Sequence, residues 1–381
     1  GGGGAEAVGG GGVSSPDGLV LVWSLALQGR PERRLTAQSP VLAARFSEAD
    51  PHLIVGGTYG GQVVAWDTRL PHGRPARRSA AAGSARGGHA HPVYCLELTG
   101  GGGAAQTLVS ASTDGVVCTW NPEQLAEPTD SFRLRSPNPP AGMEREAEMA
   151  EEGAAQEYPI AVSSFAVAGA GDSPGTPQAG KGTVAAAGYL AVGSESGAVY
   201  KSPLHLRAGA PVAGAVREYR AHFGLVTALD FNRAHARRAA AAGGRAAVGG
   251  GGGGALLLSA GVDWTTRLWR LGGGAGGQTE EKAEPLLTFQ YQTHDYVADV
   301  KWSPAHPSLF ATAAASGELA LWDLGRPGGT EAPALPPVEV VPGGGGGGGG
   351  TTLNKLAWST EGRRIAVGDG AGTAHVYTLS E

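Results

Sequence analysis

The stretch Ser110-Ala-Ser-Thr-Asp114-Gly115-Val-Val-Cys-Thr-Trp120 combines a tight turn with a short apolar segment that ends in an aromatic residue. Asp and Gly tolerate the unusual backbone angles of such a turn, and the Asp114 carboxylate can accept hydrogen bonds from nearby amides. The five residues that follow are typical of a buried strand. This stretch therefore predicts a turn followed by one strand of a sheet.

The same pattern returns seven times, each time with a small or acidic residue, usually followed by glycine, before a five-residue strand. The fourth copy lacks the terminal aromatic residue, and the fifth has Trp264 in the place of glycine. No long stretch has helical periodicity, so the sequence predicts an all-β fold. The copies are Asp17–Trp23, Gly60–Trp66, Asp114–Trp120, Ser196–Ser202, Asp263–Trp269, Ser316–Trp322 and Ala371–Tyr377.

The intervals between copies become similar once the glycine-rich and alanine-rich tracts within them are removed. The corrected interval approaches the ~40 to 45 residues of a four-stranded propeller blade. Six inner strands accompany the seven copies, so we expect a seven-bladed β-propeller whose first blade is incomplete. We also expect the chain to be an N-terminally shortened form of a longer protein, with a poorly closed ring. The predicted inner strands are Val41–Ser47, Val93–Thr99, Ile160–Val167, Leu225–Phe231, Val297–Trp302 and Leu353–Trp358.

Two copies carry a polar set with the same order and similar spacing. The sets resemble the structural tetrad of the WD-repeat family, in which buried polar side chains bond one another and join three strands of a blade. An unpaired buried polar group costs about 1–3 kcal/mol, so such a set must be complete or absent. Ser316 and Gly60 stand where other blades would need Asp. The expected tetrads are His89, Ser110, Asp114 and Trp120, and His222, Ser259, Asp263 and Trp269.

Glycine makes up 66 of the 381 residues, more than double the roughly 7% of ordinary proteins. Tracts of nearly pure Gly and Ala bury little surface against the entropy of ordering them. We expect a low-complexity glycine head at residues 1–12 and a WD-repeat propeller at residues 13–381. Long disordered insertions, Gly/Ala-rich or acidic, are expected at about 122–157, 169–182, 233–254, 272–283 and 326–350.

Composition excludes several functional classes. The formal net charge of −5 argues against binding nucleic acid through phosphate neutralisation. No apolar run reaches the ~18 to 20 residues of a membrane span, and two cysteines cannot form a disulfide framework or a four-thiolate zinc site. Candidate Ser, His and Asp sets repeat from blade to blade, which favours scaffolding over catalysis. We therefore expect a cytoplasmic protein with no enzymatic activity, no cofactor, no metal and no membrane insertion.

Several longer phrases resemble the WD-repeat half of the dynein intermediate chain family, the cytoplasmic type more than the axonemal. This resemblance implies a non-catalytic subunit of a microtubule motor whose propeller binds the tail of the dynein heavy chain, beside other dynein subunits. It implies a microtubule-associated location in the cytoplasm and a role in cargo attachment and transport. The phrases are Val55–Arg69, His91–Cys95, Ser112–Gly115, Val192–Tyr200, Asp263–Trp269, Tyr296–Phe310 and Ile365–Asp369.

One face of the predicted propeller gathers aromatic turn residues. Turns between second and third strands share this face with the loops that lead into inner strands. We expect Trp264 and Tyr296 to anchor a partner there, because aromatic residues dominate large interfaces. The alternative, that each ring packs on its own blade, stays open at this point. The residues expected on this face are Tyr59, His91, Phe223, Trp264 and Tyr296.

A second functional hypothesis comes from Trp66-Asp67-Thr68-Arg69. This tetrapeptide resembles the WDxR signature of WD-repeat substrate receptors of cullin-RING ubiquitin ligases. In those proteins the arginine contacts the adaptor, so Arg69 is a further candidate partner-binding residue. Dynein intermediate chains can carry the same four residues.

Overall fold

The structure is a computed structural model of the full chain. Short β-strands account for nearly all of the regular structure described, with one helical turn at residues 233–236. The residues described are 17–27, 29–81, 88–99, 106–136, 138–139, 158–168, 188–204, 216–220, 222–236, 255–271, 284–290, 295–326, 338–339 and 351–379.

Antiparallel sheets of three or four strands follow one another along the chain, and each is a meander in which consecutive strands pair. The first comprises β3 (Val41–Phe46), β4 (Leu53–Thr58), β5 (Val63–Asp67) and β6 (Arg77–Arg78). The second comprises β7 (Cys95–Thr99), β8 (Thr107–Ala111), β9 (Val116–Trp120) and β10 (Asp130–Arg133). The third comprises β13 (Val162–Ala168), β14 (Tyr189–Ser194), β15 (Ala198–Pro203) and β16 (Arg217–Arg220).

Three further sheets complete the series. The fourth comprises β17 (Val226–Phe231), β18 (Ala255–Gly261), β19 (Thr265–Leu271) and β20 (Leu287–Gln290). The fifth comprises β21 (Val297–Trp302), β22 (Leu309–Ala314), β23 (Glu318–Asp323) and β24 (Val338–Glu339). The sixth comprises β25 (Leu353–Trp358), β26 (Arg364–Asp369) and β27 (Ala374–Thr378).

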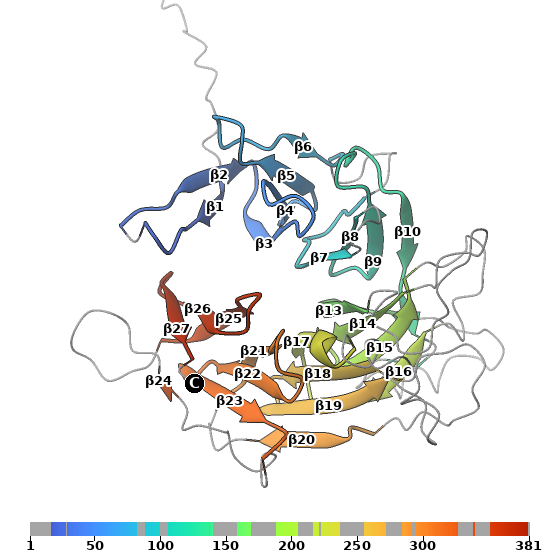
Figure 1. Ribbon diagram of the computed structural model, residues 1–381. Coiled ribbons are helices and arrows are strands. Elements are labelled where there is room, and N and C mark those ends of the chain that lie inside the picture. Colours follow the sequence, from blue (N-terminus) through green and yellow to red (C-terminus); the bar gives the residue numbers. More distant parts are fainter. Residues whose placement is uncertain are drawn as a thin grey trace, which may run out of the picture.

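The six sheets are the blades of a β-propeller. Figure 1 shows them around a common centre in chain order, with β3, β7, β13, β17, β21 and β25 innermost. All six inner strands therefore lie within two residues of the predicted ranges. The middle strands β4 and β14 are buried on both faces, which explains why they are continuous runs of apolar and small residues without polar alternation.

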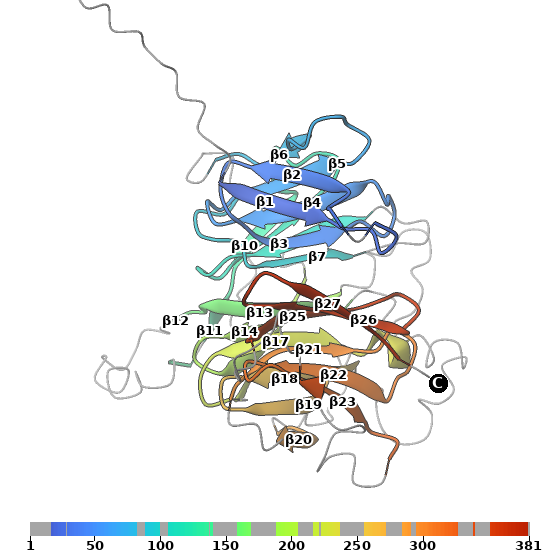
Figure 2. The same ribbon diagram turned by 90° about the vertical axis from the view of Figure 1, so that its left-hand side faces the viewer.

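The N-terminal hairpin forms a separate two-stranded sheet of β1 (Gly18–Val22) and β2 (Arg33–Ala37). Figures 1 and 2 show it beside the β3–β6 blade. Leu19, Leu21 and Trp23 lie on its exposed face, whereas the alternating Val20 and Val22 pack against the buried cluster that contains Trp66. The described residues thus contain six blades and this hairpin, so the seven-bladed type remains a prediction.

Three of the predicted insertions contain ordered structure. Residues 122–136 belong to the fold, because Leu125 and Leu134 are buried and β10 pairs with β9. Pro122 and Glu123 form a turn ahead of this outer strand, and residues 140–157 of the predicted insertion lie outside the described residues. The helical turn at 233–236 and strand β24 likewise lie within segments predicted to be insertions. The ranges 169–182 and 272–283 and the glycine head lie outside the described residues.

The short strands β11 (Arg135–Ser136) and β12 (Tyr158–Pro159) pair with each other.

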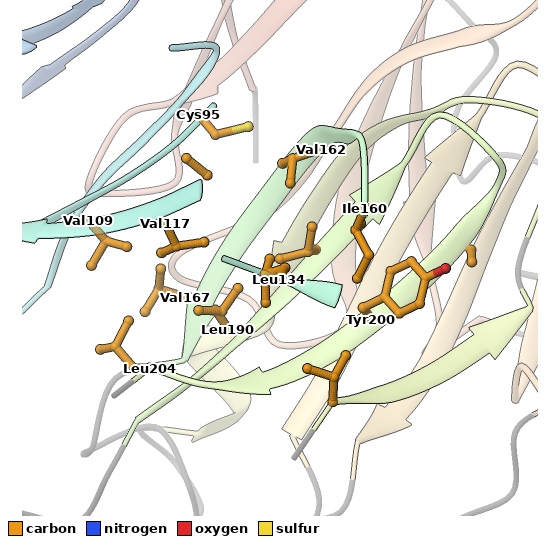
Figure 3. Close-up of a cluster of buried hydrophobic side chains, with 14 residues drawn as sticks. Cys95, Val109, Val117, Leu134, Ile160, Val162, Val167, Leu190, Tyr200 and Leu204 are labelled. Carbon is orange, nitrogen blue, oxygen red and sulfur yellow. The ribbon is translucent and has the colours of Figure 1, made fainter. Parts of the chain in front are cut away.

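The hydrophobic core lies between blades, so each blade depends on its neighbours. Figure 3 shows the cluster between the β7–β10 and β13–β16 sheets, where Val109 and Val117 face Val167, Leu190 and Leu204. Leu134, which connects β10 to β11, is completely buried in the same cluster. Because each such layer needs residues from two blades, no blade can bury its apolar surface alone.

Inner strands are also joined by side chains that bond the backbone of the next blade. The Asp230 carboxylate accepts a hydrogen bond from the Trp302 amide at 2.8 Å, and Asp299 accepts one from the Leu356 amide at 2.9 Å. Glu97 accepts one from the Val167 amide at 3.0 Å and is paired with Arg233. These carboxylates satisfy inner-strand amides that the sheets leave unpaired. They therefore fix the register between neighbouring blades.

The carboxylate of Asp299 provides a test of this joining role. Asp299→Ala leaves the buried Leu356 amide without an acceptor, so we expect the free energy of unfolding to fall by about 1–3 kcal/mol. Asp299→Asn keeps one acceptor oxygen and should lose less. Urea titration followed by circular dichroism measures both variants. Glu361→Ala, at an exposed position, is the matched control, and equal stability of all three variants would contradict the assignment.

Candidate protein-binding face

One end of the propeller carries the aromatic residues expected to form a binding face. Tyr59 and Trp264 follow the second strands β4 and β18, whereas Phe223 and Tyr296 precede the inner strands β17 and β21. In an antiparallel blade these positions lie at the same end of the sheet. All four side chains are exposed, Phe223 at 88% and Trp264 at 45%, and His91 is exposed on the loop that leads to β7.

Tyr94 is a further exposed aromatic residue of this face that the sequence analysis did not identify. It precedes β7, which begins at Cys95, two residues later than predicted. The sequence analysis placed Tyr94 inside the predicted inner strand Val93–Thr99 and assigned it no role on this face. Its place directly before an inner strand, like that of Tyr296, was the signal that could have identified it.

Trp264 has a backbone conformation that L residues other than glycine rarely adopt, with φ of 65°. The equivalent turns of other repeats hold glycine there, including Gly61, Gly115 and Gly317, with φ of 80° to 92°. A side chain in this left-handed region costs roughly 1–2 kcal/mol. Strain of this kind persists when the surrounding structure enforces it, and it concentrates at functional positions.

The strained turn is held by a chain of buried hydrogen bonds in the β17–β20 blade. The Trp269 indole N–H donates to Ser259 Oγ at 2.9 Å, and Ser259 Oγ lies 2.8 Å from His222 Nε2. His222 Nδ1 lies 2.8 Å from Asp263 Oδ1. Because the ionised carboxylate only accepts, Nδ1 carries a proton, and in the neutral ring the Ser259 hydroxyl donates to Nε2. The structure thus brings the four predicted residues of the fifth copy into one network.

Asp263 connects this network to the exposed face. Its Oδ2 accepts a hydrogen bond from the Phe223 amide at 3.3 Å, and its Oδ1 accepts one from the Thr265 hydroxyl at 2.8 Å. Burial raises the pKa of Asp263, but the hydrogen bonds from His222 and Thr265 and the Phe223 amide outweigh burial, so its pKa is lowered overall. The ionised carboxylate therefore holds both loops that present Phe223 and Trp264.

The corresponding set in the β7–β10 blade is joined less completely. His89 Nε2 lies 2.6 Å from Ser110 Oγ, which accepts the Trp120 indole N–H at 2.7 Å. Asp114 bonds the Ser112 hydroxyl and the Val116 amide, and His89 Nδ1 is buried without a hydrogen-bond partner. Burial lowers the pKa of His89 to about 4, against the opposing charge of Asp114.

Other blades place a tryptophan at the same position with different acceptors. The Trp322 indole donates to Thr312 Oγ1 at 3.0 Å, so threonine replaces serine in the β21–β24 blade. The Trp66 indole instead donates to the Thr36 carbonyl of β2 at 3.0 Å. Glycine occupies the serine position there, and a Cβ on Gly56 would lie 2.7 Å from the Trp66 ring. This hydrogen bond ties the N-terminal hairpin to the next blade.

Arg69 lies at the opposite end of the propeller from the aromatic face, because it follows the third strand β5. Its guanidinium is paired with Asp67 at 2.7 Å and Asp50 at 3.5 Å, and the side chain is 60% exposed. Hydrogen bonds from Arg69 lower the pKa of Asp67 to about 2. The structure therefore separates Arg69 from the other predicted partner-binding residues.

The described part of the chain holds no cluster of three or more His, Cys, Asp or Glu residues that could bind a metal ion. Both cysteines are free and buried. Among the same residues, no helix has the length and apolar character needed to cross a membrane.

Antiparallel meanders around one centre, with tryptophan-linked polar networks, define a β-propeller of the repeat type. No family model matches the chain. The chain is 32% identical over 371 residues to the cytoplasmic dynein 1 intermediate chain of Drosophila melanogaster. The aligned region covers 97% of this chain and 44% of the fly protein, so the chain spans less than half the length of that relative. This chain is a homologue of the cytoplasmic dynein 1 intermediate chain.

The low pKa of His89 makes stability depend on pH. The folded state keeps His89 neutral down to about pH 4, whereas in the unfolded chain the histidine binds a proton near its ordinary pKa of 6.5. Stability is therefore complete above pH 6.5 and falls as pH decreases toward 4, with this residue contributing on the order of 3 kcal/mol.

We expect His89→Gln to flatten the pH dependence of the free energy of unfolding between pH 6.5 and 4. Urea titrations at several pH values measure this slope. His91→Gln, an exposed histidine on the same loop, should retain the wild-type slope. A wild-type slope in His89→Gln would show that another group causes the pH dependence.

Proposed function

We propose that this chain is a non-catalytic subunit of a cytoplasmic dynein complex and that its propeller binds the tail of the dynein heavy chain. In this role it supports cargo attachment and transport along microtubules, beside other dynein subunits. Homology to the cytoplasmic dynein 1 intermediate chain supports this assignment across nearly the whole chain. The proposed contact surface is the aromatic face, with Trp264 and Tyr296 as anchors.

The single observation that carries the choice of face is the conformation of Trp264. A large aromatic residue occupies a left-handed position that is glycine in other turns, and 45% of its surface remains exposed. Packing on its own blade does not account for both the strain and the exposure. Exposed aromatic anchors at the centre of a contact supply most of the energy of protein interfaces, so a partner surface explains the cost.

Tyr59, Tyr94 and Phe223 extend the same face across neighbouring blades. A rigid disc with aromatic side chains on several loops suits a large partner, because little side-chain entropy is lost on binding. Arg69 is not part of this contact, since it lies at the other end and is already paired with two carboxylates.

Trp264→Ala together with Tyr296→Ala should weaken binding to a purified heavy-chain tail fragment by at least about tenfold, because both anchors are lost. Isothermal titration calorimetry with the full chain measures this affinity. Unchanged binding would exclude this face as the contact.

The matched control is Phe46→Ala, which removes an aromatic residue of similar exposure from the opposite end of the propeller. This variant should bind as the wild type does. Circular dichroism and thermal unfolding of each variant show whether the propeller remains folded.

A further inference from the structure

A hollow on the aromatic face lies where the β17–β20 and β21–β24 blades meet. Its enclosed part has a volume of about 20 Å³, enough for about one water molecule or an ammonium group, and the rest is open to solvent. Trp264 lines it beside Phe289, Val297 and Trp322, so most of its wall is aromatic or aliphatic. Among the described residues that line it, Glu318 is the charged one.

One oxygen of the Glu318 carboxylate lacks a hydrogen-bond partner. Its Oε2 is buried, and no donor in the described structure bonds it. A buried carboxylate oxygen without a partner carries the cost of lost hydration. A cation in the hollow would relieve this cost.

Trp264 provides the second half of a site for such a cation. The face of an indole ring attracts an ammonium or guanidinium group, and the attraction grows when water is excluded. Blades with glycine at this turn position have no side chain there that could contact a cation. The strained backbone of Trp264 thus places an aromatic ring beside an uncompensated carboxylate in the same hollow.

We propose that this hollow binds a basic side chain, lysine or arginine, from a protein partner, held by Glu318 and by the ring of Trp264. A single carboxylate does not provide the six to eight oxygen ligands of a calcium site, whereas one basic side chain satisfies both the carboxylate and the ring. This inference rests on the proposed function for the identity of the partner, the heavy-chain tail, but not for the chemistry of the hollow.

The chemistry of the hollow is tested with small probes on the full chain. Nα-acetyl-lysine N-methylamide should shift the indole NMR signal of Trp264, which is assigned through Trp264→Phe in protein labelled with ¹⁵N at tryptophan. The uncharged isostere Nα-acetyl-norleucine N-methylamide should not shift it. Glu318→Gln should weaken lysine-probe binding by about threefold to fivefold, and Glu361→Gln should not. Equal effects of both probes, no shift with lysine, or wild-type binding by Glu318→Gln would overturn the proposal.

Stability distinguishes a binding role of Glu318 from a structural one. Because the buried Oε2 of Glu318 has no hydrogen-bond partner, Glu318→Gln should unfold at the same urea concentration as the wild type or a higher one. A lower midpoint would show that the carboxylate supports the fold and would overturn the proposal.

Titration of the heavy-chain tail fragment separates the two proposals. If Glu318→Gln and Trp264→Ala both weaken tail binding, the basic side chain belongs to the tail. If Trp264→Ala with Tyr296→Ala abolishes tail binding but Glu318→Gln does not, the proposed face stands and the basic-residue site is wrong. If the lysine probe binds but none of the variants changes the affinity for the tail fragment, the basic-residue site in the hollow is confirmed and the proposed function of this face is wrong.

Discussion

The hydrogen-bond chain from Trp269 through Ser259 and His222 to Asp263 is the interaction on which the exposed face depends. It joins the third strand, the second strand and the loop that enters the blade, so it orients the loops of Phe223 and Trp264 from beneath. In a low-dielectric interior such a network stabilises only when every member is paired. In the β7–β10 blade the network is incomplete. Asp114 bonds the Ser112 hydroxyl, and Nδ1 of His89 has no hydrogen-bond partner.

Contacts between blades impose the second constraint. A blade is a narrow sheet whose apolar surface is covered by the next blade, and carboxylates of inner strands accept hydrogen bonds from backbone amides across three of the junctions. Burial and hydrogen bonding therefore couple neighbours in sequence around the ring. This coupling explains how a chain rich in glycine tracts retains a rigid disc, because the tracts lie between strands and the strands carry the packing.

Function and stability oppose each other at the junction of the β17–β20 and β21–β24 blades. Trp264 occupies a turn that would be less strained with glycine, and the buried Oε2 of Glu318 lacks a hydrogen-bond partner. The strained backbone of Trp264 and the unpaired oxygen of Glu318 therefore belong to the same hollow on the aromatic face. Sites that trade stability for recognition are expected to show this combination.

The sequence by itself determined the repeat, because a turn residue, a five-residue strand and a terminal aromatic residue are local features that spacing reveals. It located the six inner strands within two residues and the order of the His, Ser, Asp and Trp sets. It did not locate β10, because a short outer strand with alternating burial has a weak pattern and follows a proline-containing turn. Only the tertiary structure decided that Tyr94 is exposed, that Asp299 bonds the next blade and that Glu318 and Trp264 line one hollow. Those relations join residues of different strands or blades, and the distance between two blades is set by packing that no local pattern encodes.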